Sequence, residues 1–250
     1  METIPLRAAK TLWIYAWAVL ATVLLFVPVC LAAFFSRTGN LAFNLTQLWA
    51  WIMLKVTFVR VVTRGRDKIQ RDRSYIIIAN HASVYDILAL VTGLRIQYRW
   101  VIKKEILKIP LFGYALYASR NIFIDRGDPS RAIKSIQRGL SRLPRGVSVL
   151  FFAEGTRSPD GRIQPFKKGG FVMAVEKHLP ILPVTINGSR GILPKKSVAF
   201  HPGTVEVVVG DPIETHEVDR DHLEDLMEKT RNVIIAQYRP DMRIPKHDGR

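Results

Sequence analysis

Cysteine is almost absent from this chain, since Cys30 is the only one in 250 residues. One cysteine cannot form an internal disulfide, so the sequence gives no indication of an oxidising compartment. It also excludes the usual cysteine-rich zinc clusters, and the six histidines are scattered, so we expect no metal site. Cys30 lies within an apolar run, where a thiol is inert, and a catalytic thiolate is therefore not expected.

Signatures of several familiar enzyme classes are missing as well. The sequence has no Walker loop, no dinucleotide-binding glycine fingerprint and no His-Glu-x-x-His zinc motif. The segment Gly188-Ser189-Arg190-Gly191 has the wrong spacing for the nucleophile elbow of serine hydrolases. We therefore expect no cofactor and no covalent nucleophile.

Acidic residues are scarce relative to basic ones, 21 against 37, which gives a formal net charge of +16. Such a chain suits an anionic partner, which could be nucleic acid, an anionic membrane face or a phosphorylated small molecule. Net charge alone does not choose among them. Nucleic acid is disfavoured because no binding motif is recognisable and because the N-terminal segment is a candidate membrane anchor.

The N-terminal 59 residues contain two apolar stretches. Residues 11–35 carry no charged side chain and are long enough to cross about 30 Å of hydrocarbon as a helix, which favours a retained anchor over a cleaved signal peptide. The second stretch, residues 41–59, includes polar residues and two tryptophans, which suits an interfacial or re-entrant helix. We expect residues 1–59 to form a membrane-anchoring helical hairpin, either spanning the membrane or confined to one leaflet. In both cases the positive-inside tendency places the basic remainder in the cytoplasm.

From residue 60 onward, short apolar runs alternate with helical stretches. This alternation predicts an α/β domain over residues 60–240 with a central, mostly buried sheet flanked by helices. A basic edge segment begins at residue 60, and further strands are predicted at residues 75–79, 98–102, 122–124, 147–152, 181–186 and 205–209. Helices are predicted at residues 83–94, 113–119, 130–143, 169–177 and 219–238. The polar tail 241–250 is expected to be loose.

His81 directly follows residues 75–80, an apolar strand that leads into Asn80, and functional residues often sit at such strand ends in α/β sheets. Ser83 and Asp86 form a capping-box-like pair that predicts a helix start at Ser83. With His81 in the loop and Asp86 in the first turn, the two side chains can meet. Asp86 would then stabilise the imidazolium, and His81 would act as a general base. For this segment alone, the alternative is a capping carboxylate beside an ordinary turn histidine.

Two further strand ends carry polar groups suited to a phosphorylated ligand. One leads into Arg126, and an arginine fork binds phosphate. The other ends in four candidate binding residues: Glu154, Gly155, Thr156 and Arg157. The glycine lets backbone approach a ligand, the hydroxyl and guanidinium bind phosphate oxygens, and the carboxylate accepts a hydrogen bond from a polyol. A surface arginine and a salt-bridged turn are the structural alternatives.

Four blocks, taken together, resemble the motifs of the glycerolipid acyltransferase family, which includes bacterial 1-acyl-sn-glycerol-3-phosphate acyltransferases. Residues 80–86 look like its His-x4-Asp motif, and residues 123–126, 152–158 and 182–184 look like the second, third and fourth motifs. Pro183 in the fourth block is tolerated in a strand at an edge, a bulge or the strand start. Two departures are Ala153, where the family usually has proline, and Ala82, where glutamine is common. The second departure weakens any assignment of the acceptor.

The resemblance implies a reaction and a role for each residue. His81, oriented by Asp86, would deprotonate the free hydroxyl of a lysophospholipid acceptor, which then attacks the thioester of acyl-CoA or acyl carrier protein. The residues implied to hold phosphate and glycerol are Arg126, Glu154, Gly155, Thr156, Arg157 and Lys104, with Lys103 as the alternative to Lys104. The implied setting is the bacterial inner membrane, in contact with membrane lipids, with the catalytic domain on the cytoplasmic side. The oligomeric state is left open.

Other functions remain open on sequence alone. The acceptor could be glycerol 3-phosphate, another lysophospholipid or a lyso-ornithine lipid. A non-catalytic protein that binds anionic lipid through its basic face would not need His81. A hydrolase would release free fatty acid without any acceptor.

Overall fold

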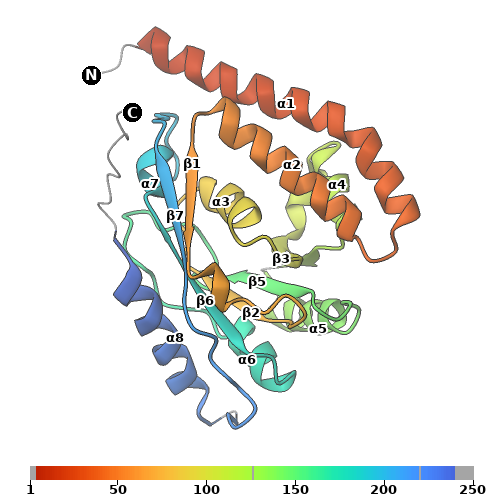
Figure 1. Cartoon of the computed structure of the whole chain (residues 1–250), viewed down its shortest axis with the longest axis vertical. Coiled ribbons are helices and arrows are strands. Elements are labelled where there is room, and N and C mark those ends of the chain that lie inside the picture. The colour runs from red at the N-terminus through yellow and green to blue at the C-terminus, as the bar shows by residue number, and fades with distance from the viewer. Residues whose placement is uncertain (1–3, 126, 220, 240–250) are drawn as a thin grey trace.

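Seven strands form one mixed sheet in the computed structural model, which describes residues 4–125, 127–219 and 221–239 (Figure 1). The strands are β1 (Arg60–Arg64), β2 (Ile76–Ala79), β3 (Tyr98–Lys103), β4 (Ile122–Ile124), β5 (Ser148–Phe152), β6 (Ile181–Asn187) and β7 (Thr204–Val209). Their order across the sheet is β1-β7-β6-β2-β5-β3-β4. The five strands from β6 to β4 in this order run parallel, whereas β7 is antiparallel to β6 and pairs in parallel with β1. The predicted α/β fold class is confirmed.

Helices cover both faces of this sheet. They are α1 (Ile4–Phe35), α2 (Asn40–Val56), α3 (Tyr85–Gly93), α4 (Phe112–Ala118), α5 (Pro129–Leu140), α6 (Gly169–Glu176), α7 (Ser189–Ile192) and α8 (Leu223–Gln237), with 3-10 turns η1 (Arg66–Lys68) and η2 (Lys104–Lys108). On one face α2 and α3 pack against the sheet and α1 lies outside α2; on the other face lie α5, α6 and α8 (Figure 1). Such double coverage explains why β2 is fully buried and reads as an uninterrupted apolar run.

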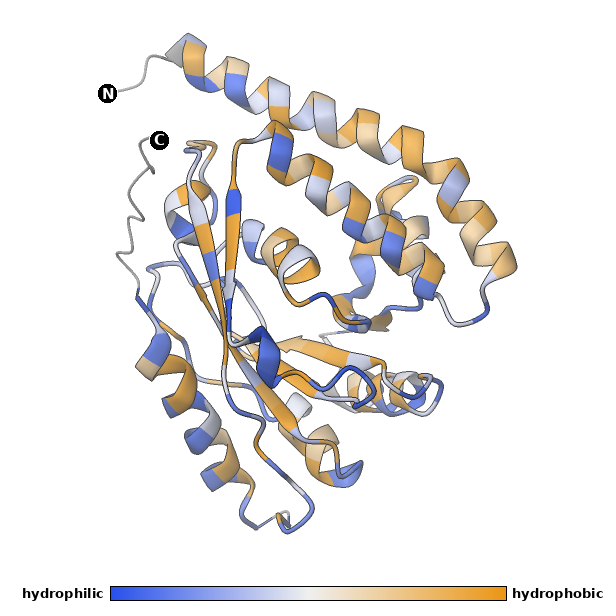
Figure 2. Ribbon diagram, in the orientation of Figure 1, coloured by the Kyte–Doolittle hydropathy of each residue, from blue (hydrophilic) through white to orange (hydrophobic). Residues whose placement is uncertain are grey.

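The N-terminal hairpin shares its core with the α/β domain. Phe43, Met53 and Leu54 of α2 are buried in the same cluster as residues of β3 and α3. The hairpin turn contains Gly39 with φ +76°, where an added Cβ would come within 2.6 Å of a side-chain carbon of Arg120, so the turn requires glycine. Among the described residues, one helix, residues 5–35, is long and apolar enough to cross a membrane, and its apolar stretch is 11% buried (Figure 2).

Pro183 lies inside the sheet, because β6 pairs with β2 on one side and with β7 on the other. The pairing of β6 with the chain around β7 shifts by one residue between the Ile181–Ile213 bridge and the Val184–Val209 pair. This shift is a β-bulge, one of the three positions in which we expected a strand proline. The Pro183 carbonyl still accepts a hydrogen bond from the Gly210 amide at 2.9 Å. The proline therefore marks an irregular ladder rather than an edge of the sheet.

Candidate active site

The candidate site lies at the carboxyl edge of the parallel strands. His81 follows β2, Glu154 follows β5, and Lys104 follows β3. Because these strands are neighbours and run in the same direction, their ends bring together segments far apart in sequence. The edge therefore gathers the first and third blocks that the sequence singled out, and the end of β4 adds Asp125 of the second block.

His81 and Asp86 form a hydrogen-bonded pair. The His81 Nδ1 atom lies 2.8 Å from Asp86 Oδ2, and the Asp86 side chain is fully buried. The Phe152 ring stacks on the imidazole with its centroid 3.7 Å away and an angle of 9° between the planes. With Nδ1 held by Asp86 and one ring face covered, Nε2 is the nitrogen left to face a substrate. The predicted meeting of a loop histidine with a first-turn carboxylate is what the structure shows.

The helix after His81 begins two residues later than we predicted, at Tyr85 rather than Ser83. The reason is that Asp86 Oδ2 accepts hydrogen bonds from the backbone amides of Ala82 and Ser83, at 2.7 and 2.8 Å, which holds these residues in the loop. The Ser83 hydroxyl donates to the Leu193 carbonyl at 2.7 Å and accepts from the Tyr85 amide at 3.3 Å. Asp86 thus serves both the loop and the imidazole, so the capping and catalytic interpretations describe the same carboxylate.

Glu154 is buried, with 4% of its surface exposed, and both of its carboxylate oxygens accept hydrogen bonds from the protein. Oε1 accepts a hydrogen bond from the backbone amide of His81 at 2.7 Å, and Oε2 accepts one from the backbone amide of Gln164 at 3.0 Å. Burial raises the pKa of Glu154 to about 7, and the nearby Asp86 charge adds to this rise, while the two amides oppose it. These contacts position Glu154 behind His81, as a support for its loop.

A second hydrogen bond joins the loop that carries His81 to the loop that carries Glu154. In this bond the His81 residue accepts, whereas in the bond to Glu154 it donates. The Ser158 amide donates to the His81 carbonyl at 2.7 Å. The Ser158 and Ser83 hydroxyls both donate to backbone carbonyls, those of Arg162 and Leu193, so both hydroxyl protons are engaged. Within the described residues, these loops present an oriented base without an activated nucleophile.

Gly155, Thr156 and Arg157 form the turn after β5. Gly155 has φ +72°, a conformation that favours glycine, Thr156 is exposed and Arg157 is half-buried. Lys195 reaches this turn from the loop after α7, with its Nζ 2.6 Å from the Arg157 carbonyl and 3.3 Å from Thr156 Oγ1. Nothing in the sequence indicates that Lys195 belongs to the site, because it lies 38 residues after Arg157 and only the fold returns it to this turn. The ammonium group adds positive charge beside Arg157.

Lys104 and Lys103 differ in their partners. Lys104 Nζ lies 2.5 Å from Asp125 Oδ2, and this hydrogen bond is the main reason why the pKa of Lys104 is raised. Lys103 pairs with Glu105 of its own turn at 3.4 Å. Of the two lysines, Lys104 is therefore the one placed beside the second motif. Arg126, which follows Asp125, lies outside the described residues.

Among the described residues, no group of histidine, cysteine, aspartate and glutamate side chains is arranged to hold a metal ion. The groups joined by hydrogen bonds are His81, its carboxylate partner Asp86 and the buried Glu154. Cationic side chains lie on the segments after β3, β5 and α7. This arrangement suits removal of a proton from a hydroxyl group on an anionic molecule.

Comparison with known proteins adds independent information. A family profile described as "Acyltransferase" matches residues 60–187. A 1-acyl-sn-glycerol-3-phosphate acyltransferase from Pseudomonas aeruginosa is 35% identical over 168 residues, covering 67% of this chain and 64% of the relative. The human 1-acyl-sn-glycerol-3-phosphate acyltransferase alpha is 29% identical, over 91% of this chain and 78% of the relative.

A solved structure is similar over almost the whole chain. The crystal structure of the 1-acyl-sn-glycerophosphate acyltransferase PlsC from Thermotoga maritima has a TM-score of 0.79 and 28% identity, covering 91% of this chain and 92% of that chain. Some curated relatives are longer, since the chain spans 54% of a chloroplastic 1-acyl-sn-glycerol-3-phosphate acyltransferase from Brassica napus that is 32% identical.

Proposed function

Because the chain belongs to the acyltransferase family, we propose that it transfers a fatty acyl group to the free hydroxyl of 1-acyl-sn-glycerol 3-phosphate and so makes phosphatidic acid for phospholipid biosynthesis. The donor is the thioester of acyl-CoA or acyl carrier protein. The observation that carries the proposal is the His81–Asp86 pair at 2.8 Å, at the carboxyl end of β2.

His81 acts as the general base. Its Nδ1–H donates to Asp86, which leaves Nε2 free to take the proton from the acceptor hydroxyl. The acceptor oxygen attacks the thioester carbon and forms the new C–O bond. When the adduct collapses, the C–S bond breaks and the imidazolium returns its proton to the leaving sulfur. No acyl-enzyme intermediate is required, which agrees with the engaged serine hydroxyls of the two loops.

The cationic rim holds the acceptor phosphate. We assign this role to Arg157, Thr156 and Lys104, with Gly155 allowing close approach of the backbone. We also assign it to Arg126, which follows Asp125, the partner of Lys104. Lys195 holds the turn that carries Arg157. Glu154 supports His81 through the loop backbone, since its oxygens accept the His81 and Gln164 backbone N–H groups. Each oxygen has a second lone pair, with which Glu154 accepts a hydrogen bond from the acceptor glycerol.

The lipid acceptor requires a membrane location, which the long apolar helix α1 supports. We propose a bacterial inner membrane with the site on the cytoplasmic side, since the chain is strongly basic. Bilayer lipids and the acyl donor are then the partners of the site.

The test is acyl transfer from labelled acyl-CoA to lysophosphatidic acid in detergent, comparing the wild type with His81→Ala. We expect the variant to lose at least about a hundredfold in rate, the usual contribution of a positioned base. Equal unfolding midpoints for the two proteins would exclude a folding defect. Full activity of the variant would overturn the role of His81.

The acceptor class is tested with Arg157→Ala. Loss of activity on lysophosphatidic acid, with no loss on an acceptor that lacks phosphate, is the expected result. If wild type makes no product with any donor or acceptor, the result would favour the alternative of a non-catalytic protein that binds anionic lipid. Free fatty acid formed without an acceptor would indicate a hydrolase.

A further inference from the structure

Four large apolar side chains are exposed on η2, on α4 and on the link between them, outside the N-terminal hairpin. Leu107 is 40% exposed, Ile109 44%, Tyr114 44% and Tyr117 57%. Exposed apolar residues scattered singly are ordinary on a soluble protein, but four within a short segment form a patch. We call these four residues the η2–α4 patch.

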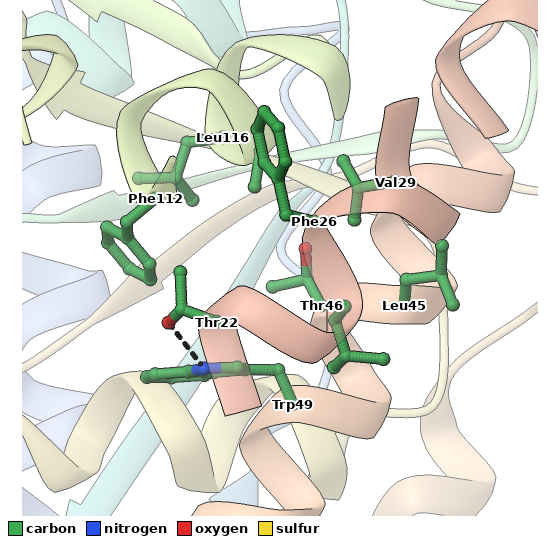
Figure 3. A pocket seen from close by; sticks show the side chains of 10 residues that line it. Thr22, Phe26, Val29, Leu45, Thr46, Trp49, Phe112 and Leu116 are labelled. Atoms are coloured by element: carbon green, nitrogen blue, oxygen red, sulfur yellow. Dashed lines mark hydrogen bonds between the residues drawn. The ribbon is translucent and has the colours of Figure 1, made fainter. Parts of the chain in front are cut away.

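The inner face of α4 is fixed against the hairpin. Phe112 and Leu116 line a pocket together with Thr22 and Phe26 of α1 and Trp49 of α2 (Figure 3). The Phe112 and Trp49 rings lie 5.4 Å apart, and the Trp49 indole donates to the Thr22 hydroxyl at 3.1 Å. Because both hairpin helices hold α4, the direction in which its other face points is set relative to α1.

That other face continues the outer surface of α1. Tyr114 and Tyr117 are three residues apart, so they share one side of α4. The Tyr114 ring lies 5.7 Å from the Phe26 ring of α1, edge to face. On α1, Val23 and Val27 flank Phe26 and are exposed. The apolar surface therefore passes from α1 to α4 without a polar boundary at this contact.

The rim of the patch is basic. Lys103, Lys104 and Lys108 are all exposed on the same segment. Tyrosine and lysine side chains have an apolar body and a polar tip, which suits the boundary between lipid tails and headgroups. Lysines at that boundary also attract anionic headgroups. Both the shape and the charge of the segment therefore fit a lipid surface.

We propose that the η2–α4 patch inserts into the bilayer beside α1 as a second membrane-contacting element. The proposal rests on the membrane location proposed above and is independent of the reaction. It has a consequence for the site, because η2 starts at Lys104, which is bonded to Asp125 at the second motif. The bilayer would reach the rim of the site, so a lipid acceptor could enter without leaving the membrane.

The test measures the depth of single labelled cysteines in the full chain. Cys30→Ser removes the only cysteine, and Leu107→Cys and Tyr117→Cys then carry an environment-sensitive fluorophore. Leu20→Cys on the exposed face of α1 is the membrane control, and Glu228→Cys on the exposed face of α8 is the solvent control. Vesicles contain anionic lipid with a nitroxide on the acyl chain as quencher.

We expect at least threefold quenching at positions 107, 117 and 20, and none at position 228. Quenching at position 20 alone would overturn the proposal while leaving the membrane location intact. No quenching at position 20 would overturn the membrane location and the proposal with it. Two further outcomes would also overturn the proposal. If the fluorophores at positions 107 and 117 become buried only at a higher protein concentration, the patch contacts a second copy of the chain. If they become buried only when acyl carrier protein is added, the patch contacts the donor.

A second variant separates insertion from labelling artefacts. We expect Leu107→Glu with Tyr117→Glu to weaken vesicle binding at least tenfold, while Glu228→Lys leaves it unchanged. Transfer to a short-chain, monomeric acceptor should stay within twofold of wild type, because the patch does not touch the reacting groups. Unchanged vesicle binding in the double variant would count against insertion.

Discussion

At the scale of single residues, Asp86 joins the folding of the site to its chemistry. One oxygen, Oδ2, is shared by the His81 ring and by the amides of Ala82 and Ser83. The other oxygen, Oδ1, is buried without a hydrogen-bond partner among the described residues. A buried carboxylate with one unpaired oxygen is costly while its neighbour is neutral, and less so once that neighbour carries a positive charge. The same geometry that holds the loop would therefore favour the imidazolium that the proposed reaction forms.

Glu154 makes stability depend on pH near neutrality. Its pKa is raised from 4.5 to about 7 in the folded chain, so between these values the native state holds a proton that the unfolded state releases. Its contribution is therefore fully present below about pH 4.5 and is lost as the pH rises through about 7, up to about 3 kcal/mol in all. We expect Glu154→Gln to remove this decrease in the free energy of unfolding with rising pH. The measurement is the unfolding midpoint in detergent from pH 5 to pH 8, as a difference between variant and wild type.

The matched control is Asp160→Asn in the same loop, whose carboxylate is exposed. Its pKa is lowered chiefly by the Arg162 amide, so it titrates below the tested range. Glutamine also presents an amide group to a backbone N–H, so the variant should be less stable at pH 5 by about 1–3 kcal/mol. Parallel pH profiles for wild type and Glu154→Gln would show that burial does not keep this carboxyl protonated.

At the scale of secondary-structure elements, Arg99 ties the hairpin turn to the sheet. It lies on β3, is fully buried and pairs with no carboxylate among the described residues. Its Nη2 donates to the Thr38 carbonyl at 3.0 Å and to Asn40 Oδ1 at 2.5 Å, and its guanidinium lies over the Phe43 ring. Burial lowers the pKa of Arg99 to about 10, which leaves it charged at neutral pH. Burying a charge that is hydrogen-bonded only to neutral oxygens costs desolvation free energy. No apolar side chain could replace Arg99 and still donate these hydrogen bonds.

Arg99→Met should loosen the hairpin turn without disrupting the sheet. Methionine fills much of the space but leaves Thr38 and Asn40 without their donor, at a cost of about 1–3 kcal/mol. We expect hydrogen exchange of the amides of residues 36–43 to accelerate about tenfold or more, while those of β2 and β5 stay slow. Lys103→Met, at the exposed end of the same strand, is the control. Equal acceleration throughout the chain would instead indicate global destabilisation.

The sequence predicts a secondary-structure element well where the local pattern of apolar residues alone determines its type. The isoleucine run of β2 predicts a buried strand that ends just before His81. The observed strand begins one residue after the predicted start. It predicts poorly what depends on tertiary partners. Nothing near Arg99 indicates that an arginine would be fully buried, because its acceptors come from the hairpin. Likewise, the role of Glu154 as a support is set by the amides of two distant segments, and Lys195 joins the site only through the loop after α7.

At the scale of the whole molecule, α1 is attached along its length to α2, to the main core and to α4. Trp13 donates to the Val56 carbonyl at 2.8 Å, Trp17 packs against the main core, and Phe26 meets Tyr114. Further along, Ala32 is buried with Ala118 of α4. From Trp13 to Ala32 the helix extends about 29 Å, which is the thickness of the hydrocarbon layer. Because α1 is held to the rest of the protein over that distance, it is not free to cross the bilayer on its own, and we predict that it lies along one leaflet.

This arrangement predicts that both ends of α1 face the same side of the membrane. In the Cys30→Ser background, Ala8→Cys and Arg37→Cys place thiols at two exposed positions near the helix ends, with Glu228→Cys as the reference on α8. Protein is added to preformed, sealed vesicles, and a membrane-impermeant maleimide is then added outside. We expect all three thiols to react to the same extent with and without detergent, because neither end has crossed. A thiol at position 8 or 37 that reacts only after detergent would mean that α1 spans the bilayer, and the contacts between α1 and α4 would then have to open in the membrane.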